Sequence, residues 1–310
     1  MKTLRDCAPL GQQPIRWPVL FFLFALLALA LMGWRWGGTV EDSQAYFDTA
    51  RYFRGEAGAG ALRAPFPYRT LVPAMAAILP GDLRQAFAAL NWMFMTASAC
   101  LMTAAARRAG LDSQRATGAG VLMLVALPTF WYAPYLLVDP GSICARSAFV
   151  LAVLAGQPWL AALAGLAGTA VREENILLLV WLLAARRISL GSGLAVLAAA
   201  GAWLVAVRFW LIPGLPAYAW QPSWWTVKHA LHDLRSLASI AGSALPIVPL
   251  AVTGWRRAPA SLKPLRSLLL LMVLPPLYAA LCVRVEGRIV WELYPFLIPF
   301  AVASGRERAI

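Results

Sequence analysis

The chain has 310 residues, of which 61% are hydrophobic and only 13% charged, and its mean hydropathy is +0.67. A soluble domain is about half apolar and about a quarter charged, so this composition excludes a cytosolic enzyme, a disordered tail and a disulfide scaffold. The net charge of +13 is typical of basic loops beside anionic lipid, and no soluble stretch interleaves basic with aromatic residues, which excludes nucleic acid as a partner. We predict an all-α, polytopic transmembrane helical bundle that forms a single integral membrane domain over residues 1–310.

The first apolar run covers residues 17–32 and follows three basic residues, Lys2, Arg5 and Arg16. A bilayer core needs about 20 apolar residues per helix, so this run predicts the first membrane span, with its amino end in the cytoplasm. The next residues, 33–36, contain no A-x-A cleavage site. We therefore expect an uncleaved anchor rather than a signal peptide.

Residues 37–82 form the longest polar stretch of the chain, and we expect them to make a first external loop. Within the loop, residues 43–54 predict a short amphipathic helix. Residues 71–79 are apolar but too short to span a bilayer, so they predict an interfacial half-helix that Pro80 and Gly81 close.

Apolar runs and short charged turns alternate through the rest of the chain. Arginine doublets at 107–108, 186–187 and 256–257 mark the cytoplasmic turns, because short loops follow the positive-inside rule. A second external loop is expected at 213–235. The topology has about ten helical segments, with both termini in the cytoplasm. After the first span, these segments are predicted at 83–106, 116–138, 143–156, 159–171, 176–185, 190–212, 236–254, 267–283 and 289–304.

Ionisable groups gather on the predicted external side, several of them inside apolar runs. Such groups are costly at membrane depth and usually line a functional cavity. Arginine can bond two phosphate oxygens at once, and a carboxylate can take a proton from a hydroxyl nucleophile. The pattern therefore predicts an anion site beside a general base. The residues concerned are Glu41, Asp42, Arg69, Asp139, Arg172, Glu173, Glu174, Glu286, Arg288 and Glu292.

The same groups also have a structural interpretation. The acidic pair after the first span would be solvated loop charges. Asp139 would cap a helix or turn in its Asp-Pro-Gly sequence. The two embedded arginines would form internal ion pairs, Arg172 with Glu173 or Glu174 and Arg288 with Glu286 or Glu292.

Three stretches carry a resemblance to a known family. They are the acidic pair followed by Tyr in residues 41–46 (EDSQAY), the YR-x-LVP element in 67–73 (PYRTLVP), and the pair formed by 165–173 (GLAGTAVRE) and 286–295 (EGRIVWELYP). The chain resembles the GT-C superfamily of membrane glycosyltransferases, in the small bacterial branch that lacks a soluble domain. It departs from the wider family in having no sizeable carboxyl-terminal periplasmic domain.

This resemblance implies that a hexosyl or pentosyl group moves from a polyprenyl-phosphate donor to a glycan, lipid or protein acceptor. It implies a multi-pass enzyme of glycan biosynthesis in the bacterial inner membrane, with its site facing the periplasm or exterior of the cell envelope. Asp42 best matches the family's first-loop catalytic base, and Glu41 is the second candidate. By analogy with single-displacement sugar chemistry, one base would give inversion.

We expect Arg69, Arg172 and Arg288 to face one cavity at the outer leaflet and to hold the donor phosphate. Tyr68 and Tyr46 would orient the donor. Supporting roles are expected for Glu173, Asp139, Glu286 and Glu292. No metal site is predicted, and a divalent cation (Mg²⁺ or Mn²⁺) beside the acidic pair is the open alternative.

Two other classes of function compete with the transferase. A secondary transporter or flippase of a lipid-linked sugar or another anionic substrate would also use short helices that meet at a charged turn, although the two halves of the chain show no inverted repeat. A non-catalytic assembly subunit would use the charges as interfacial ion pairs. The long first loop with its acidic pair favours the enzyme.

Overall fold

The computed structural model of the chain describes residues 15–40, 42–216, 221–282 and 286–304. These residues form the α-helices α1 to α17, joined by short 3₁₀ and π turns, with no strand among them. Their one β contact is an isolated bridge between Gly38 and Tyr135. The prediction of an all-α protein is confirmed.

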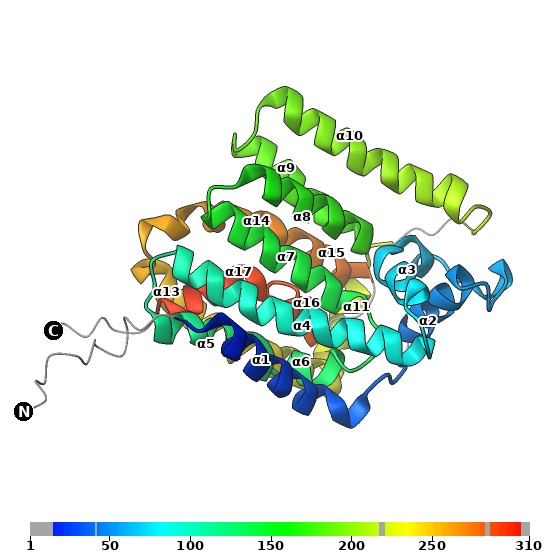
Figure 1. Cartoon of the computed structure of the whole chain (residues 1–310), viewed down its shortest axis with the longest axis horizontal. Helices are drawn as coiled ribbons and strands as arrows, with labels where there is room; N and C mark the ends of the chain where they lie inside the picture. Colours follow the sequence, from blue (N-terminus) through cyan, green and yellow to red (C-terminus); the bar gives the residue numbers. More distant parts are fainter. Residues whose placement is uncertain (1–14, 41, 217–220, 283–285, 305–310) are drawn as a thin grey trace, which may run out of the picture.

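The long helix α4 (Leu83–Arg108) forms the centre of the bundle. The helices α1 (Trp17–Met32), α5 (Ser113–Val125) and α7 (Asp139–Leu154) all pack against it, and so does α17 (Tyr294–Val302). Figure 1 shows these helices side by side. The core between them is apolar, as the burial of apolar surface requires.

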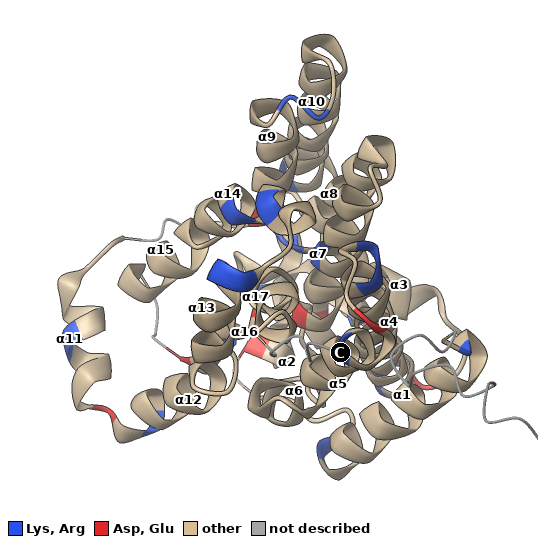
Figure 2. Cartoon of the chain, turned by 90° about the vertical axis from the view of Figure 1, so that its left-hand side faces the viewer, with Lys and Arg blue, Asp and Glu red and all other residues tan. Residues whose placement is uncertain are grey.

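Three helices form successive layers on one side of this core (Figure 1). The helix α8 (Pro158–Val171) packs on α7, α9 (Ile176–Ala184) packs on α8, and α10 (Leu190–Ala206) contacts both. Figure 2 shows α10 at the edge of the molecule. The polar turn between α8 and α9 therefore lies between the core and this outer helix.

The loop predicted at 37–82 contains the two helices expected there, α2 (Asp42–Phe53) and α3 (Leu71–Ile78), which pack on each other at one end of the bundle (Figure 1). The Arg54 guanidinium joins them, because it donates to main-chain carbonyls at and beyond the end of α3. Such bonds satisfy carbonyls that a helix end leaves unpaired. The acceptors are Ala76, Ala77, Leu79 and Gly81.

The carboxyl-terminal part of the chain is made of short helices. Figure 2 shows α11 and α12 on the outside of the bundle, away from α10. The helix α12 packs on α16, and α13 packs on α17. The bounds of these helices are α11 (Trp224–His232), α12 (Leu234–Ala244), α13 (Val248–Arg257), α14 (Lys263–Met272), α15 (Leu274–Cys282) and α16 (Gly287–Trp291).

The described part of the chain contains five stretches that are long and apolar enough to cross a membrane. The stretch at 190–211 is buried within the protein over only 17% of its most apolar window, so its apolar side chains are available to lipid. Together with the composition, these helices identify a helical membrane protein. The five stretches are Trp17–Arg35, Leu83–Arg108, Leu190–Leu211, Leu234–Arg257 and Ala260–Cys282.

Several predicted segments consist of two helices rather than one, although candidate membrane stretches cover 236–254 completely and 267–283 as far as Cys282. Proline lacks an N–H and clashes with the preceding helical turn, and a proline lies at or just after each break. The predicted loop at 213–235 also contains a helix, α11. The structure divides 116–138 into α5 and α6 (Leu127–Tyr132), 236–254 into α12 and α13, 267–283 into α14 and α15, and 289–304 into α16 and α17.

A glycine contact between α13 and α17 gives a test of this packing. A Cβ at Gly254 would overlap the main-chain carbonyl of Phe300, whereas a Cβ at Gly201 in α10 would meet no atom within 4 Å. We expect Gly254→Ala to destabilise the protein by about 1–3 kcal/mol through overpacking. Gly201→Ala should be neutral or stabilising by up to about 1 kcal/mol. Thermal unfolding of both variants in detergent measures the difference, and equal melting temperatures would contradict the packing.

Candidate functional site

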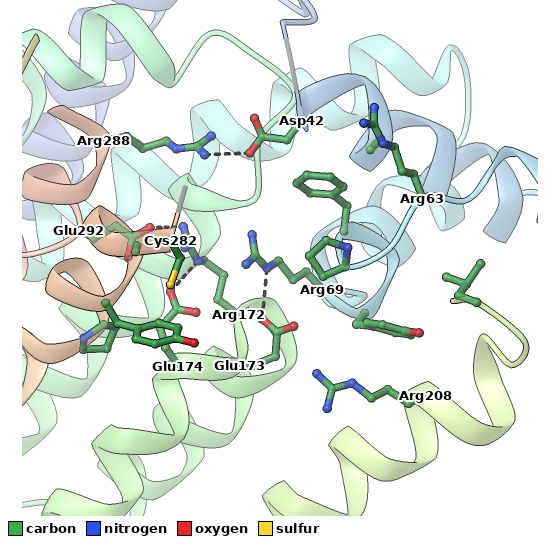
Figure 3. A pocket seen from close by; sticks show the side chains of 18 of the residues that line it. Asp42, Arg63, Arg69, Arg172, Glu173, Glu174, Arg208, Cys282, Arg288 and Glu292 are labelled. Atoms are coloured by element: carbon green, nitrogen blue, oxygen red, sulfur yellow. Dashed lines mark hydrogen bonds and ion pairs between the residues drawn. The ribbon is translucent and has the colours of Figure 1, made fainter. Parts of the chain in front are cut away.

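One pocket of about 1190 Å³ collects most of the predicted site residues. Its walls come from α2, the loop before α3, the turn between α8 and α9, the end of α10, and the helices α15 and α16. Figure 3 shows the charged side chains converging on this space. The predicted residues that line it are Asp42, Tyr68, Arg69, Arg172, Glu173, Glu286, Arg288 and Glu292.

Two predicted residues that the structure describes do not line the pocket. Tyr46 and Asp139 lie directly behind it, because each contacts an arginine of its wall. Glu41 lies outside the described residues, so its predicted role is not placed.

The turn between α8 and α9 presents Arg172 and the next two glutamates to the pocket. The chain leaves α8 in an extended conformation at Arg172 and makes a 3₁₀ turn over Glu173–Asn175. The buried Asn175 amide donates to the Gly168 carbonyl at 3.0 Å and to Ser142 Oγ at 2.9 Å. These bonds satisfy polar groups that would be costly to leave unpaired in an apolar bundle.

Asp139 is the buried acid at the start of α7, and it joins two arginines. Its Oδ1 lies 2.7 Å from Arg172 Nη1 and 3.8 Å from Arg288 Nε. The amino end of α7 has no side-chain capping bond. The capping interpretation of Asp139 is therefore wrong, because the residue acts as the shared counter-ion of the two guanidinium groups.

The predicted ion-pair alternatives for Arg172 are resolved in favour of Glu174. Arg172 Nε lies 2.6 Å from Glu174 Oε1, and Arg172 Nη1 also pairs with Glu292. Glu173 turns the other way and pairs with Arg69 Nε at 3.1 Å. The two adjacent glutamates thus hold two different arginines of the pocket.

Arg69 also donates to the hydroxyl of Tyr46 on α2. Burial raises the pKa of this hydroxyl to about 12, and the charge of Arg69 only partly opposes the effect. Tyr46 is therefore protonated at neutral pH, and its oxygen accepts the hydrogen bond. This bond fixes Arg69 to the helix that carries Asp42.

Arg288 connects the first loop to the carboxyl-terminal part of the chain. Its Nη2 donates to Asp42 Oδ2 at 2.8 Å (Figure 3). Its Nε lies 3.2 Å from Glu286 Oε1. Of the two predicted partners it pairs with Glu286, while Glu292 pairs with Arg172 and Arg146. Arg288 therefore forms ion pairs and also lines the pocket. The sequence alone offered these two roles as alternatives.

Arg146 is the main site residue that the sequence analysis missed. It is fully buried in α7, where Nε donates to Asn175 Oδ1 at 2.6 Å and Nη1 to the Glu292 carbonyl at 2.9 Å. Its Nη2 lies 3.3 Å from Glu174. The signal in the sequence was a single arginine within the apolar run 143–156, because a charge at such a position needs buried partners.

The donor groups of the pocket do not suit a divalent cation. Among the residues that the structure describes, no three His, Cys, Asp or Glu side chains converge to hold a metal. The carboxylates face guanidinium groups instead, as Asp42 faces Arg288 and Glu173 faces Arg69. Mg²⁺ or Mn²⁺ therefore does not fit the described side chains, and a site without metal stays a prediction.

The pairing of Glu174 predicts a pH dependence of stability. Burial alone would raise the pKa of this carboxyl, but Arg172 and Arg146 lower it from 4.5 to about 2. Since the folded-state pKa is the lower one, the ionised group stabilises the fold above pH 4.5, and this contribution is lost as the pH falls to about 2. We expect Glu174→Gln to melt below the parental protein at neutral pH, with a gap that narrows below pH 4.5.

The control for this measurement is Glu56→Gln, which changes an exposed carboxylate 3.8 Å from Arg54. Exposed pairs contribute at most about 1 kcal/mol, so this variant should melt close to the parental protein at every pH. A gap for Glu174→Gln that stays constant down to pH 2 would contradict the pairing.

The pocket thus offers two kinds of chemistry. A carboxylate such as Asp42 can accept a proton from a hydroxyl group. The arginines supply positive charge that can stabilise a phosphate or another oxyanion. Comparison of the chain with known protein families, with curated proteins and with solved structures finds no match.

Proposed function

We propose that the chain is a GT-C-type membrane glycosyltransferase with about ten membrane segments. It transfers a sugar from a polyprenyl-phosphate donor to an acceptor on the extracytoplasmic side. The observation that supports this proposal best is the composition of the pocket. Its wall joins Asp42 and several arginines to apolar residues of two candidate membrane stretches, among them Phe209 and Pro276. A substrate with a sugar-phosphate head and an apolar chain matches both parts of this wall.

Asp42 is the proposed base. Arg288 holds its Oδ2, and no second cation pairs with this carboxylate among the described residues. The carboxylate takes the proton of the acceptor hydroxyl while the hydroxyl oxygen bonds to C1 of the sugar. The bond from C1 to the phosphate oxygen breaks, and its electron pair leaves with the polyprenyl phosphate. A single displacement of this kind inverts the configuration at C1.

The leaving group needs charge stabilisation rather than a strong acid, because a phosphate monoester is a stable anion. Arg172 and Arg288 each pair with three carboxylates, so their charge is largely neutralised. Within the described part of the chain, Arg69 pairs with Glu173 alone, and it is the best placed of the three predicted arginines to contact the donor. The pairs of the first two are Asp139, Glu174 and Glu292 for Arg172, and Asp42, Asp139 and Glu286 for Arg288.

One observation favours a transporter or flippase as the second candidate. The helices α8 and α9 are short and meet at charged residues, as broken helices do at transporter binding sites. The charges at this break are neutralised by ion pairs within the protein, however, as the pair of Arg172 and Glu174 shows. A transport site would need such charges to face the cargo, so the transferase accounts better for the pocket.

The first test replaces the proposed base. We expect Asp42→Asn to lower the initial rate of sugar transfer by at least about a hundredfold, because general base catalysis contributes about 10²–10⁴ in rate. The matched control is Asp48→Asn, which removes a carboxylate of the same helix and the same pocket and should leave the rate unchanged. Purified protein in lipid is given radiolabelled polyprenyl-phosphate sugars, with a membrane extract as the source of acceptor.

Two results of this assay would contradict the proposal. Transfer by Asp42→Asn at the parental rate would exclude Asp42 as the base. Movement of the labelled lipid across the bilayer by the parental protein, without any transfer, would identify the flippase instead.

The second test addresses donor binding. We expect Arg69→Ala to raise the KM for the donor about tenfold and to change kcat less, since a charge-assisted hydrogen bond is worth about 1.5–3 kcal/mol. Arg51→Ala is the control, because Arg51 lies on α2 and pairs with Asp48 at 3.7 Å. Steady-state kinetics over a range of donor concentrations separates the two constants, and a parental KM would exclude Arg69 from donor binding.

A further inference from the structure

Arg208 lines the pocket at the end of the candidate membrane stretch Leu190–Leu211. The helix α10 ends there in a π turn, Val207–Leu211, which differs from the regular helix before it. Turns of this kind occur frequently at functional sites. The guanidinium carbon of Arg208 lies 5.1 Å from the centre of the Tyr68 ring, which belongs to the loop before α3.

Arg208 differs from four other arginines of the site in its partners. It shares this difference with Arg63, an exposed arginine in the loop before α3 that also lines the pocket and has no carboxylate within ion-pair distance among the described residues. Arg69, Arg146, Arg172 and Arg288 each pair with at least one carboxylate. Among the described residues, no carboxylate lies within ion-pair distance of Arg208, whose contact is the face of Tyr68. Its full positive charge is therefore available to an anionic ligand, whereas the charge of the paired arginines is largely neutralised.

The surroundings of Arg208 indicate what kind of anion would bind. The next two residues of the turn are Phe209 and Trp210, whose side chains are 68% and 79% exposed. Exposed aromatic residues at the end of a membrane span are typical of the boundary between lipid and water. The pocket wall also includes Phe209, Leu215 and Pro275, which are apolar. A phosphate that carries a long apolar chain matches this end of the pocket.

The position of Arg208 relative to the proposed base fits the same ligand. In the view of Figure 3, Arg69 lies between Asp42 and Arg208. One end of the pocket therefore carries the proposed base, and the other carries Arg208. We propose that Arg208 binds the phosphate group of a lipid phosphate, with Tyr68 holding its guanidinium in place. The apolar chain leaves past Phe209, and the group attached to the phosphate points toward Asp42. The identity of the lipid as a donor rests on the proposed function.

A basic residue at the end of a membrane span can have a different role, in which its charged end merely extends to the lipid headgroups as an anchor. The chain offers a matched control for this role in Arg108. It is an exposed arginine at the end of the candidate stretch Leu83–Arg108, and it does not line the pocket. If Arg208 were only such an anchor, Arg208→Gln and Arg108→Gln would behave alike.

The test measures binding of radiolabelled undecaprenyl phosphate to the full chain in phosphatidylcholine nanodiscs. We expect Arg208→Gln to weaken binding about tenfold, which corresponds to about 1.4 kcal/mol, and Arg108→Gln to leave it unchanged. Arg208→Lys keeps the charge and should retain most of the affinity, while Tyr68→Leu removes the ring and should weaken binding a few-fold. Unlabelled undecaprenol and inorganic phosphate, added as competitors, separate the contributions of the chain and of the phosphate.

Three results would overturn the inference. They are parental affinity in Arg208→Gln, an equal loss in Arg108→Gln, and displacement by inorganic phosphate as effective as by the lipid phosphate. The last would identify a site for free phosphate.

Failure of this inference and failure of the proposed function are distinguishable. Sugar transfer that depends on Asp42, with binding that does not depend on Arg208, would overturn only the inference. If lipid binding depends on Arg208 but no sugar is transferred, the lipid-phosphate site is supported and the proposed glycosyltransferase activity is overturned.

Discussion

Paired burial of charge is the constraint on which the rest of this structure depends. Arg146 and Asp139 are almost completely inaccessible in a chain with few charged residues, and an isolated charge at such a place would be prohibitively costly. Each is therefore surrounded by counter-ions from other segments: Arg146 meets Glu174 and Glu292, and Asp139 meets Arg172. Removing one partner of a buried pair typically costs about 3–5 kcal/mol, so these contacts hold their segments in one arrangement.

The same network builds the pocket. Arg288 joins α16 to Asp42 at the start of α2, although the two residues are 246 positions apart. Arg69 joins the first loop to the turn that follows α8. Because both arginines are held by carboxylates, the polar groups of the pocket are ordered before any ligand binds, as electrostatic stabilisation of a reaction requires. Arg208 stands outside the network, which leaves its charge for a ligand.

The sequence predicted the helices well wherever hydrophobicity alone decides. The segments at 83–106, 159–171 and 176–185 agree closely with α4, α8 and α9, and both helices of the first loop are present. The segments that contain two helices instead of one are those in which prolines interrupt an apolar run, because hydropathy does not register a missing N–H. The candidate site was predicted from charges at unexpected places, and this reasoning found Arg172 and Arg288. It missed Arg146, because a single arginine in an apolar run does not say which acids meet it.

The sequence by itself determined that the protein is helical, belongs in a membrane and concentrates its ionisable residues in a few stretches. Composition and apolar length are local properties, and local physics suffices for them. Only the tertiary structure decided the pairing: Glu174 rather than Glu173 meets Arg172, and Asp139 serves as a counter-ion instead of a cap. Which charges meet depends on how distant helices pack and on which carboxylate each guanidinium can reach, and neither is written in the order of the residues.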